Sequence, residues 1–348
     1  MKANVLHAIG DLRYEEVPTP QAGAGEVLVA VRACGICGSD VPRVFENGTY
    51  HFPTIIGHEF AGEVVAAGDE AGKAMVGKRV SVFPLIPCRE CDCCERGDYE
   101  MCHHYNYLGS RCDGAFAEYV VAPVWNLCPL PDEVALEEGA MMEPAAVAVH
   151  ALKRSGMKLG DTVVVFGPGT IGMIMAQVAR AAGAAQVVLV GRSENKLQFA
   201  RENVGVELTC NSQTDDVVKY VNDLTAGRGA DVVIEGTGGQ STLNLCFDVT
   251  RHNGNIVALG NPHDDVHLDK TSYWKLLRRQ LHLHGTWNSS FGFTRNDWTD
   301  VVDLLAQKRL SLSPLITHRL LLDQLNEGLR LMRDRNVYTN KVMIINPA

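Results

Sequence analysis

The chain has 348 residues, 46% of them hydrophobic and 21% charged, which is the composition of a folded protein with room for two domains. Its formal net charge of -9 argues against nucleic-acid binding, which requires clustered lysine and arginine. No apolar run is long enough to cross a membrane, and residues 1–17 lack the apolar core of a secretion signal. We therefore expect a soluble, cytoplasmic protein that binds neither nucleic acid nor a membrane.

The chain up to about residue 150 predicts a mostly β domain. Short runs rich in β-branched residues, separated by glycine-containing turns, predict strands within residues 26–40, 55–68, 77–84 and 114–123. The eleven cysteines of a chain without an export signal are expected to be thiols or metal ligands, not disulfides.

The character of the sequence changes at about residue 155. Short apolar runs then alternate with segments of helical periodicity, which is typical of βαβ units on a parallel sheet. Two amphipathic helices are predicted within residues 296–310 and 322–334, and a last strand at 341–347 resembles the first domain. This order predicts a nucleotide-binding domain inserted between two parts of a β-rich domain.

A glycine-rich loop follows the first strand of the inserted domain. Residues VVVFGPGTIG place Gly167, Gly169 and Gly172 in a G-x-G-x-x-G pattern. In a dinucleotide-binding loop these glycines allow the tight turn, the approach of the pyrophosphate and close packing of helix on strand. The helix that opens at Thr170 and Ile171 would offer amide groups to the phosphates. The alternative is a glycine turn in a domain that binds no ligand.

The end of the second strand of this domain indicates which coenzyme binds. An NAD-binding protein usually has a carboxylate here for the ribose hydroxyls, but this chain has Gly191, Arg192 and Ser193. Without the carboxylate a 2′-phosphate is not repelled, and an arginine can pair with it in a fork geometry. We therefore favour NADP(H) over NAD(H). The alternative is that Arg192 only stacks on the adenine, which leaves NAD as the coenzyme.

Residues IPCRECDCCERGDYEMC contain five cysteines, four of them spaced C-x2-C-x2-C-x7-C. Four thiolates at short spacing suit the closed, tetrahedral coordination of a structural zinc ion. A redox dithiol would be expected at a helix start in a thioredoxin-like context, and an iron-sulfur cluster is the alternative with the same ligands. Cys93 is expected to point away. The predicted ligands are Cys88, Cys91, Cys94 and Cys102.

A closed zinc site cannot bind substrate, so catalysis needs a second site. The segment CGICGSD contains Cys37 and Ser39, GHEF contains His58 and Glu59, and MMEPAAVAVH contains Glu143. A thiolate, an imidazole and a carboxylate would form a mixed ligand set that leaves a position open. From spacing alone, a structural histidine and a helix start at the glutamate before proline are the alternatives.

Together, GHEFAGEVVAAG, the four-cysteine segment and VVVFGPGTIG resemble the zinc-containing medium-chain dehydrogenases, in their polyol (sorbitol dehydrogenase-like) branch, over essentially the whole chain. Residues 37–64, 107–121 and 308–319 are most similar to the galactitol-1-phosphate 5-dehydrogenase group. The resemblance implies an α/β protein with two domains. They are a GroES-like, mostly β catalytic domain (1–152 and 286–348) and a Rossmann domain with a doubly wound parallel sheet (153–285).

The resemblance also implies residue roles. Cys37, His58 and Glu143 would bind a catalytic zinc ion, and Glu59 would be the carboxylate that reaches it directly or through water. Ser39 would pass the proton of the substrate alcohol to solvent while hydride goes to the nicotinamide. With the four-cysteine site this gives one catalytic and one structural Zn²⁺ per chain. The family's assemblies imply a homodimer or homotetramer.

Four further positions are expected beside the nicotinamide half of the coenzyme, in the segments EGTGG, ALG and GTWN. They are Thr237, Gly260, Trp287 and Asn288. The chain departs from the galactitol-phosphate enzymes at Gly191, where those carry Asp, and this departure puts NAD specificity and the substrate in question.

The predicted function is zinc- and NAD(P)-dependent oxidation of a polyol to a keto sugar, in particular of a sugar-alcohol phosphate such as galactitol 1-phosphate. The phosphate would need a cation, and arginine suits it by bidentate pairing. Arg43 and Arg111 lie beside the proposed active-site segments, with Arg111 preferred in its glycine-flanked loop. Ordinary surface ion pairs are the alternative for both.

Other functions stay open at this point. The substrate could be an unphosphorylated polyol or diol (sorbitol, xylitol, L-idonate, butanediol) or threonine. A catalytically silent NADPH-binding protein is the non-enzyme alternative, and loss of a catalytic zinc ligand or of Ser39 would indicate it. The chain keeps all of these residues.

Overall fold

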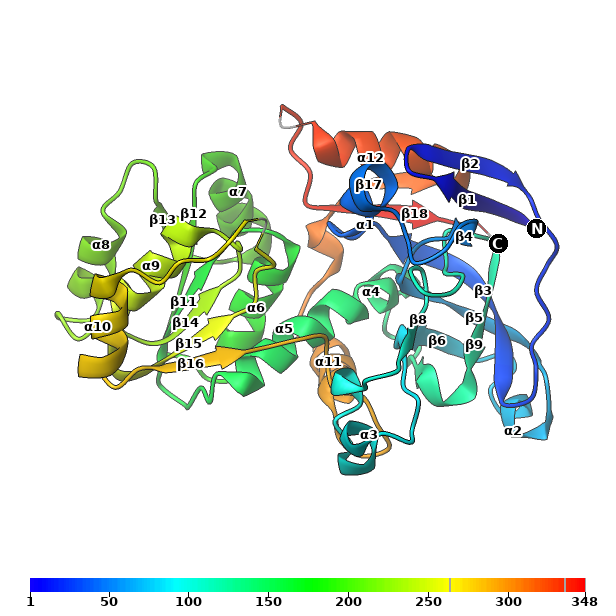
Figure 1. Cartoon of the computed structure of the whole chain (residues 1–348), viewed down its shortest axis with the longest axis horizontal. Coiled ribbons are helices and arrows are strands. Elements are labelled where there is room, and N and C mark those ends of the chain that lie inside the picture. Colours follow the sequence, from blue (N-terminus) through cyan, green and yellow to red (C-terminus); the bar gives the residue numbers. More distant parts are fainter. Residues whose placement is uncertain (263, 335, 348) are drawn as a thin grey trace. The chain divides into compact units, whose positions relative to one another are not determined.

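The computed structural model describes residues 1–262, 264–334 and 336–347, and the chain divides into two compact units (Figure 1). The first comprises Met1–Pro144, Ser290–Ala306 and Leu312–Ala348, and the second Ala145–Ser289 and Gln307–Ser311. The chain passes from the first unit to the second at 144/145 and back at 289/290, and residues 307–311 also belong to the second. The domain bounds predicted from the sequence are 152/153 and 285/286. Most of helix α5 (Met142–Arg154) belongs to the second unit, which explains the first difference.

The first unit is built on a seven-stranded sheet of order β10-β6-β5-β3-β18-β17, with β9 also paired to β3. Its pairs are antiparallel, except that β17 and β18 run parallel. The four segments predicted as strands each contain one strand of this sheet. The bounds are β3 Glu26–Gly35, β5 Glu59–Ala67, β6 Arg79–Val82, β9 Tyr119–Pro123, β10 Leu127–Pro129, β17 Ile316–Leu321 and β18 Lys341–Ile345.

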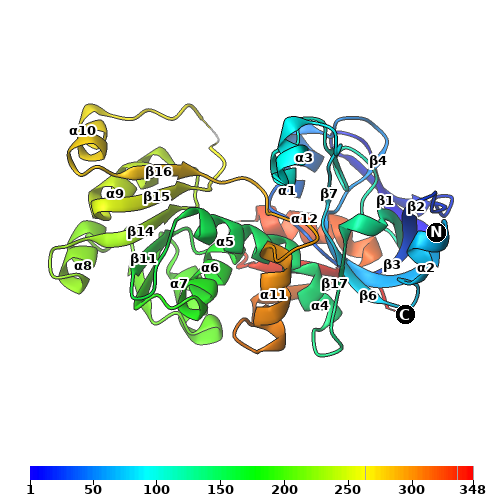
Figure 2. The same ribbon diagram turned by 90° about the horizontal axis from the view of Figure 1, so that it is seen from below.

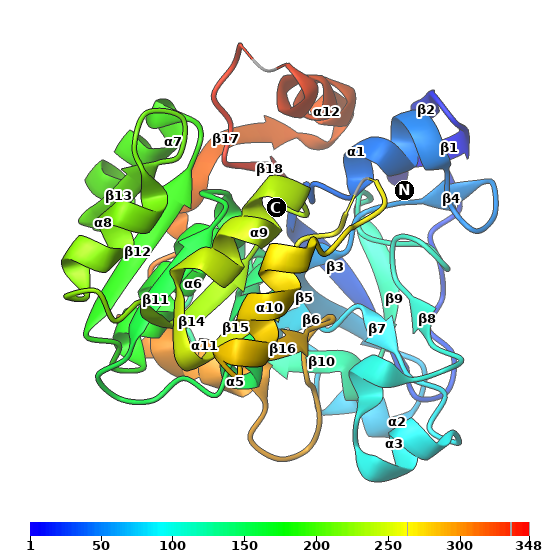
Figure 3. The same ribbon diagram turned by 60° about the vertical axis from the view of Figure 1, so that its left-hand side comes forward.

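Smaller elements complete this unit. A second sheet has the order β2-β1-β4, and β7 pairs with β8. The core packs residues such as Phe60 and Phe116 of the sheet region against Leu329 of α12, which lies against β17 and β18 (Figure 3). The bounds are β1 Lys2–Ala8, β2 Asp11–Glu16, β4 Thr54–Ile55, β7 Leu85–Ile86, β8 Asn106–Tyr107, α1 Asp40–Pro42, α2 Glu70–Lys73, α3 Asp92–Arg96, α4 Leu136–Ala140, α11 Asp297–Ala306 and α12 Leu325–Arg333.

The second unit is a parallel sheet of six strands in the order β13-β12-β11-β14-β15-β16. Helices cover it, and α9 packs between α8 and α10 (Figures 1 and 2). The bounds are β11 Thr162–Phe166, β12 Gln186–Gly191, β13 Leu208–Asn211, β14 Ala230–Glu235, β15 Thr250–Ala258, β16 His282–Gly285, α6 Thr170–Ala181, α7 Glu194–Phe199, α8 Val217–Leu224, α9 Gln240–Val249 and α10 Lys270–Arg278.

This strand order confirms the predicted doubly wound sheet. The chain leaves β11 toward β12 on one side and later returns to place β14 on the other, so the order reverses at β11. In open α/β sheets a ligand binds at the carboxyl ends of the strands where this reversal occurs. The glycine-rich loop follows β11 at that point. Among the described residues, no helix has the length and apolar character needed to span a membrane.

Candidate functional site

The register of two neighbouring strands brings the first group of metal-ligating side chains together. Gly35 at the end of β3 pairs with Glu59 at the start of β5, so Cys37 and His58 leave the sheet at the same edge. One ligand atom each from Cys37, His58 and Glu59 lies within 4.8 Å of the other two. A Cβ on Gly35 would stand 2.4 Å from the Glu59 carboxylate, so this close approach requires glycine.

A fully buried carboxylate orients this group. Asp40 accepts hydrogen bonds from the Cys37 amide (3.0 Å) and from Nη1 of Arg43 (2.7 Å). Its Oδ1 also lies 3.6 Å from Nδ1 of His58, a buried nitrogen with no hydrogen-bond partner among the residues described. With Nδ1 facing Asp40, Nε2 is the ring nitrogen available to a metal, and carboxylate–histidine–metal is a common arrangement. The residues therefore fit a metal ion.

Glu59 is held by a buried lysine. Nζ of Lys341, the first residue of β18, forms an ion pair with Glu59 and donates a hydrogen bond to the Ile36 carbonyl (3.1 Å). The two side chains are only 4% and 2% exposed. Burial disfavours the charge on Lys341, but the attraction of Glu59 and of other acidic neighbours outweighs it and raises the pKa of the ammonium group.

Glu143 lies close to this group but outside the set of atoms within 4.8 Å of one another. Its Oε1 accepts a hydrogen bond from the hydroxyl of Tyr107 (3.4 Å), whose ring packs edge-on against His58 at 5.8 Å between centroids. Burial raises the pKa of Glu143 to about 7, with Glu59 adding to the effect and His58 opposing it. Burial and the neighbouring carboxylates also raise the pKa of the Cys37 thiol.

Ser39 is an exposed residue immediately before α1, two positions after Cys37. Its side chain makes no capping hydrogen bond to the helix. An exposed hydroxyl this close to the ligand set can exchange protons with solvent.

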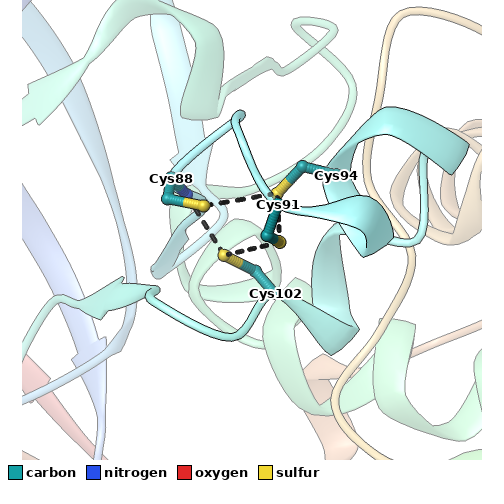
Figure 4. A group of neighbouring side chains, drawn as sticks. All are labelled: Cys88, Cys91, Cys94 and Cys102. Atoms are coloured by element: carbon teal, nitrogen blue, oxygen red, sulfur yellow. Dashed lines mark hydrogen bonds between the residues drawn. The ribbon is translucent and has the colours of Figure 1, made fainter.

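The four predicted cysteines converge on one point (Figure 4). The sulfur atoms of Cys88 and Cys94 lie 4.0 Å apart, those of Cys91 and Cys94 3.6 Å, and those of Cys91 and Cys102 4.0 Å. Four sulfurs bound to one zinc ion at about 2.3 Å would be separated by about 3.8 Å. The positions therefore fit a tetrahedral metal site.

Backbone amides support the same site. The Cys88 amide donates to Sγ of Cys102 (3.2 Å), and the amides of His103 and Cys94 donate to Cys91 and lower the pKa of that thiol to about 6. Burial raises the pKa of Cys94 to about 12. Such amide donors stabilise thiolates, which is the form that binds zinc. Cys93 is not in this set.

The glycine-rich loop has the conformation that its pattern predicts. Gly167 has φ +106°, and a Cβ on Gly172 would stand 2.0 Å from the Gly167 carbonyl oxygen. A Cβ on Gly169 would meet nothing within 4 Å, so the chain itself leaves space there. Helix α6 begins directly afterwards at Thr170 and Ile171 and presents backbone amides at its N-terminus. The loop therefore fits the pyrophosphate of a dinucleotide.

The end of β12 is shaped by a contact with this loop. A Cβ on Gly191 would stand 2.3 Å from Cγ of Pro168, so position 191 has no room for a side chain. Arg192 and Ser193 follow and are exposed. In the described part of the chain, no hydrogen bond or ion pair engages Arg192. Glu194, by contrast, is paired with Arg201 (2.6 Å) and accepts from Asn211 (3.1 Å).

The positions expected beside the nicotinamide belong to this same unit. The amide and hydroxyl of Thr237 donate to Oε1 of Glu235 (2.9 and 2.5 Å), which fixes the turn after β14. A Cβ on Gly260 would stand 2.0 Å from the Gly238 amide nitrogen. Trp287 is 56% exposed, and Asn288 has φ +53°.

The two candidate phosphate-binding arginines differ in their surroundings. Arg43 is committed to the buried Asp40. The guanidinium of Arg111 lies between two tyrosine rings, 4.5 Å from the centroid of Tyr50 and 4.1 Å from that of Tyr105. It donates to the Tyr50 hydroxyl (3.3 Å) and the Tyr105 carbonyl (3.1 Å), so it is firmly oriented.

Sequence reasoning missed three residues of this site. Asp40 is the last residue of the segment CGICGSD, and an acid three positions after Cys37 could have suggested its role. Lys341 opens an otherwise apolar strand, which is an unusual place for a lysine and was the available signal. Nothing in the sequence distinguishes Tyr107 from the other tyrosines.

Comparisons with known proteins agree with this arrangement. Residues 23–132 match the family described as alcohol dehydrogenase GroES-like domain, and residues 170–307 match the family described as zinc-binding dehydrogenase. The chain is 34% identical to galactitol 1-phosphate 5-dehydrogenase of Escherichia coli K12, over 99% of this chain and 100% of that protein. It is also 34% identical to sorbitol dehydrogenase 2 of Saccharomyces cerevisiae, over 91% and 90% of the two chains.

Two solved structures resemble this chain over almost its whole length. Galactitol-1-phosphate dehydrogenase from Escherichia coli superposes with a TM-score of 0.92 at 33% identity, over 99% of this chain and 100% of that one. A zinc-binding dehydrogenase from Sinorhizobium meliloti, bound to NADP, superposes with a TM-score of 0.91 at 31% identity, over 99% of both chains.

The ion pair between Lys341 and Glu59 generates a prediction. Replacing Lys341 with Met leaves a buried carboxylate without its counter-ion, which should cost about 3–5 kcal/mol of stability. The midpoint of urea denaturation of the metal-free protein should therefore fall clearly. Adding zinc should recover more stability in this variant than in the unchanged protein, because a bound cation would replace the missing counter-ion of Glu59.

Two further variants control this experiment. Lys341→Arg keeps the charge and should lose much less stability. The double change Lys341→Met with Glu59→Gln removes both charges and should recover part of the loss. Equal midpoints for the unchanged protein and Lys341→Met would show that the ion pair does not stabilise the site.

Proposed function

This chain belongs to the zinc-containing medium-chain dehydrogenases, in the polyol branch, and we propose that it interconverts a phosphorylated sugar alcohol and its keto sugar with NADP(H). The observation that carries the proposal is that ligand atoms of Cys37, His58 and Glu59 lie within 4.8 Å of one another. In addition, Nδ1 of the His58 imidazole has no hydrogen-bond partner among the described residues. The proposal of a phosphorylated substrate rests on Arg111, and the choice of NADP(H) rests on Arg192.

The chain's own residues have separate tasks in this reaction. Cys37, His58 and Glu143 would hold the catalytic zinc, which supplies Lewis-acid polarisation of the substrate oxygen. Asp40 orients the imidazole, and the exposed hydroxyl of Ser39 carries the alcohol proton to solvent. Glu59 is kept within reach of the metal position by Lys341, so it can act as a further ligand.

Arg192 supports the preference for NADP(H). It follows the strand end at which a ribose-binding carboxylate usually stands, it is exposed, and the neighbouring acid Glu194 is already occupied by Arg201. A guanidinium without an internal partner is suited to the 2′-phosphate. The similarity to the Sinorhizobium meliloti protein bound to NADP agrees with this proposal.

We expect Arg192→Ala to raise KM for NADP(H) by about 10- to 100-fold, the worth of one charge-assisted hydrogen-bonded pair, and to leave KM for NAD(H) nearly unchanged. Arg201→Ala is the matched control, since Arg201 lies beside the same strand end but is paired with Glu194. Steady-state kinetics with both coenzymes measure this. A strong preference of the unchanged enzyme for NAD(H) would refute the role of Arg192.

Arg111 supports a phosphorylated substrate. Its guanidinium plane is held by Tyr50 and Tyr105, and ring contacts continue from Tyr105 to Tyr107 (6.2 Å) and from Tyr107 to His58 (5.8 Å). These contacts join Arg111 to the metal-ligand group in the same unit. Two N–H groups are used within the chain. Others can donate to a phosphate.

We expect Arg111→Ala to lower kcat/KM for galactitol 1-phosphate by about 10- to 100-fold and to leave any residual rate with sorbitol unchanged. Arg89→Ala is the matched control, because Arg89 stacks on Trp125 (4.7 Å) beside the four-cysteine site. Initial rates should be compared with galactitol 1-phosphate, sorbitol, xylitol, L-idonate, butanediol and threonine. Activity confined to the unphosphorylated compounds would refute the phosphate proposal and favour a sorbitol-type enzyme.

The edge of the second unit supports self-association. Among the described residues β16 pairs only with β15, and Leu283 on it is 47% exposed. An unprotected edge strand with an exposed apolar side chain can pair with a second copy of itself. We propose a homodimer through this edge, with a tetramer as the alternative assembly.

Light scattering should therefore give at least the mass of a dimer at micromolar concentration. Leu283→Asp should shift the protein toward the monomer. Leu159→Asp, at an 86% exposed leucine of the same unit, should not. A monomeric unchanged protein would contradict the proposal.

A further inference from the structure

Cys93 is the one cysteine of residues 86–102 that does not belong to the four-cysteine set, and it lies in a separate cluster of ligating groups. Its Sγ lies 3.8 Å from Nε2 of His103, and that nitrogen lies 2.9 Å from Oδ1 of Asp92. All three ligand atoms lie within 4.8 Å of one another. We propose that Asp92, Cys93 and His103 form a third metal site, for a zinc-like divalent cation.

The new site shares its two chain segments with the four-cysteine site. In the segment that begins α3, Cys91 and Cys94 belong to the four-cysteine set, whereas Asp92 and Cys93 between them belong to the other cluster. In the second segment Cys102 belongs to the first set and its neighbour His103 to the other. A metal in each site would therefore link the same two segments twice.

The three donors suit a borderline metal ion. Thiolate, imidazole and carboxylate are all ligands of Zn²⁺, with bond lengths of about 2.0 to 2.3 Å. Tetrahedral geometry then separates ligand atoms by about 3.3 to 3.8 Å. The distance from Cys93 to His103 already fits, and the shorter one from His103 to Asp92 is a hydrogen bond that metal binding would replace. The side chains of Asp92 and His103 are 62% and 57% exposed, so they can adjust.

Arg96 orients the ligands from the outer side. It donates to Oδ2 of Asp92 (3.0 Å), to Sγ of Cys93 (3.4 Å) and to Oδ2 of Asp98 (3.2 Å). Asp92 can therefore accept the hydrogen bond from Arg96 with Oδ2 and bind the metal with Oδ1. Metal binding displaces the proton of the Cys93 thiol to solvent as the sulfur–metal bond forms. Two carboxylates and a thiolate against one guanidinium then leave a formal charge of -2 (3 negative, 1 positive), which a divalent cation neutralises.

The third site should bind more weakly than the four-cysteine site. It has three protein ligands where the other has four, only one of them is a thiolate, and two are exposed side chains that must be ordered. Its occupancy should therefore depend on the free zinc concentration in a range where the four-cysteine site stays full.

The test measures zinc per chain after equilibration in buffers of fixed free zinc concentration. The unchanged protein should rise from two to three zinc ions per chain, whereas Cys93→Ser and His103→Gln should stay at two. The matched control is His104→Gln, which changes an exposed neighbouring histidine whose ring centroid lies 6.3 Å from that of His103. It should still bind three. Because His103 is exposed, its replacement tests the site even if Cys93→Ser misfolds.

A second readout uses cobalt. Cobalt(II) added to protein that already holds two zinc ions should give a thiolate-to-cobalt charge-transfer band, which His103→Gln should weaken and Cys93→Ser abolish. Equal zinc contents of the unchanged protein and both variants at the highest free zinc concentration would overturn the proposal. The baseline of two ions rests on the proposed catalytic site, and a baseline of one in the variants would show that site to be empty without affecting the difference of one ion that tests the third site.

Discussion

An excess of buried acidic groups at the ends of β3 and β5 is the constraint on which the catalytic unit depends. Asp40, Glu59 and Glu143 are all buried, and the cations that face them are Lys341 and Arg43. A low-dielectric site does not tolerate unbalanced charge, so protons or a metal must compensate. The raised pKa values of Glu143 and Cys37 are in the direction of the first solution, because burial favours the protonated form of both groups. A divalent cation would supply the second.

The same constraint explains why Glu59 and Glu143 have different surroundings. Glu59 has a counter-ion within the chain, Lys341, that does not depend on a metal. Among the described residues the hydrogen bond to Glu143 comes from the Tyr107 hydroxyl, and burial raises the pKa of this carboxyl to about 7. The two carboxylates therefore differ in what a bound metal would change: Glu59 already has a cation beside it, whereas Glu143 would gain one.

Site residues could be predicted from the sequence when they lie close together along the chain, and much less well when they lie far apart. The glycine-rich loop and the four-cysteine set lie within short segments, where spacing translates directly into geometry. The donor group of Cys37 and His58 required the resemblance, because the pairing of β3 with β5 is not readable from either segment. Lys341 lies 282 residues from Glu59, and no local pattern connects them. The first boundary between the units lies after Pro144, inside the continuous helix α5, where the sequence pattern gives no sign of a division.

The coenzyme site shows a further limit of reading positions one at a time. Taken alone, Gly191 indicates only that the usual ribose-binding carboxylate is absent. In the structure a side chain at 191 would collide with Pro168, the residue between the first two glycines of the loop. An aspartate there requires a smaller residue at 168, or a loop that has moved away from β12. The residues at positions 168 and 191 therefore depend on each other. They decide whether an acid can stand at the end of β12, while the exposed Arg192, which takes no part in this contact, supplies the positive charge.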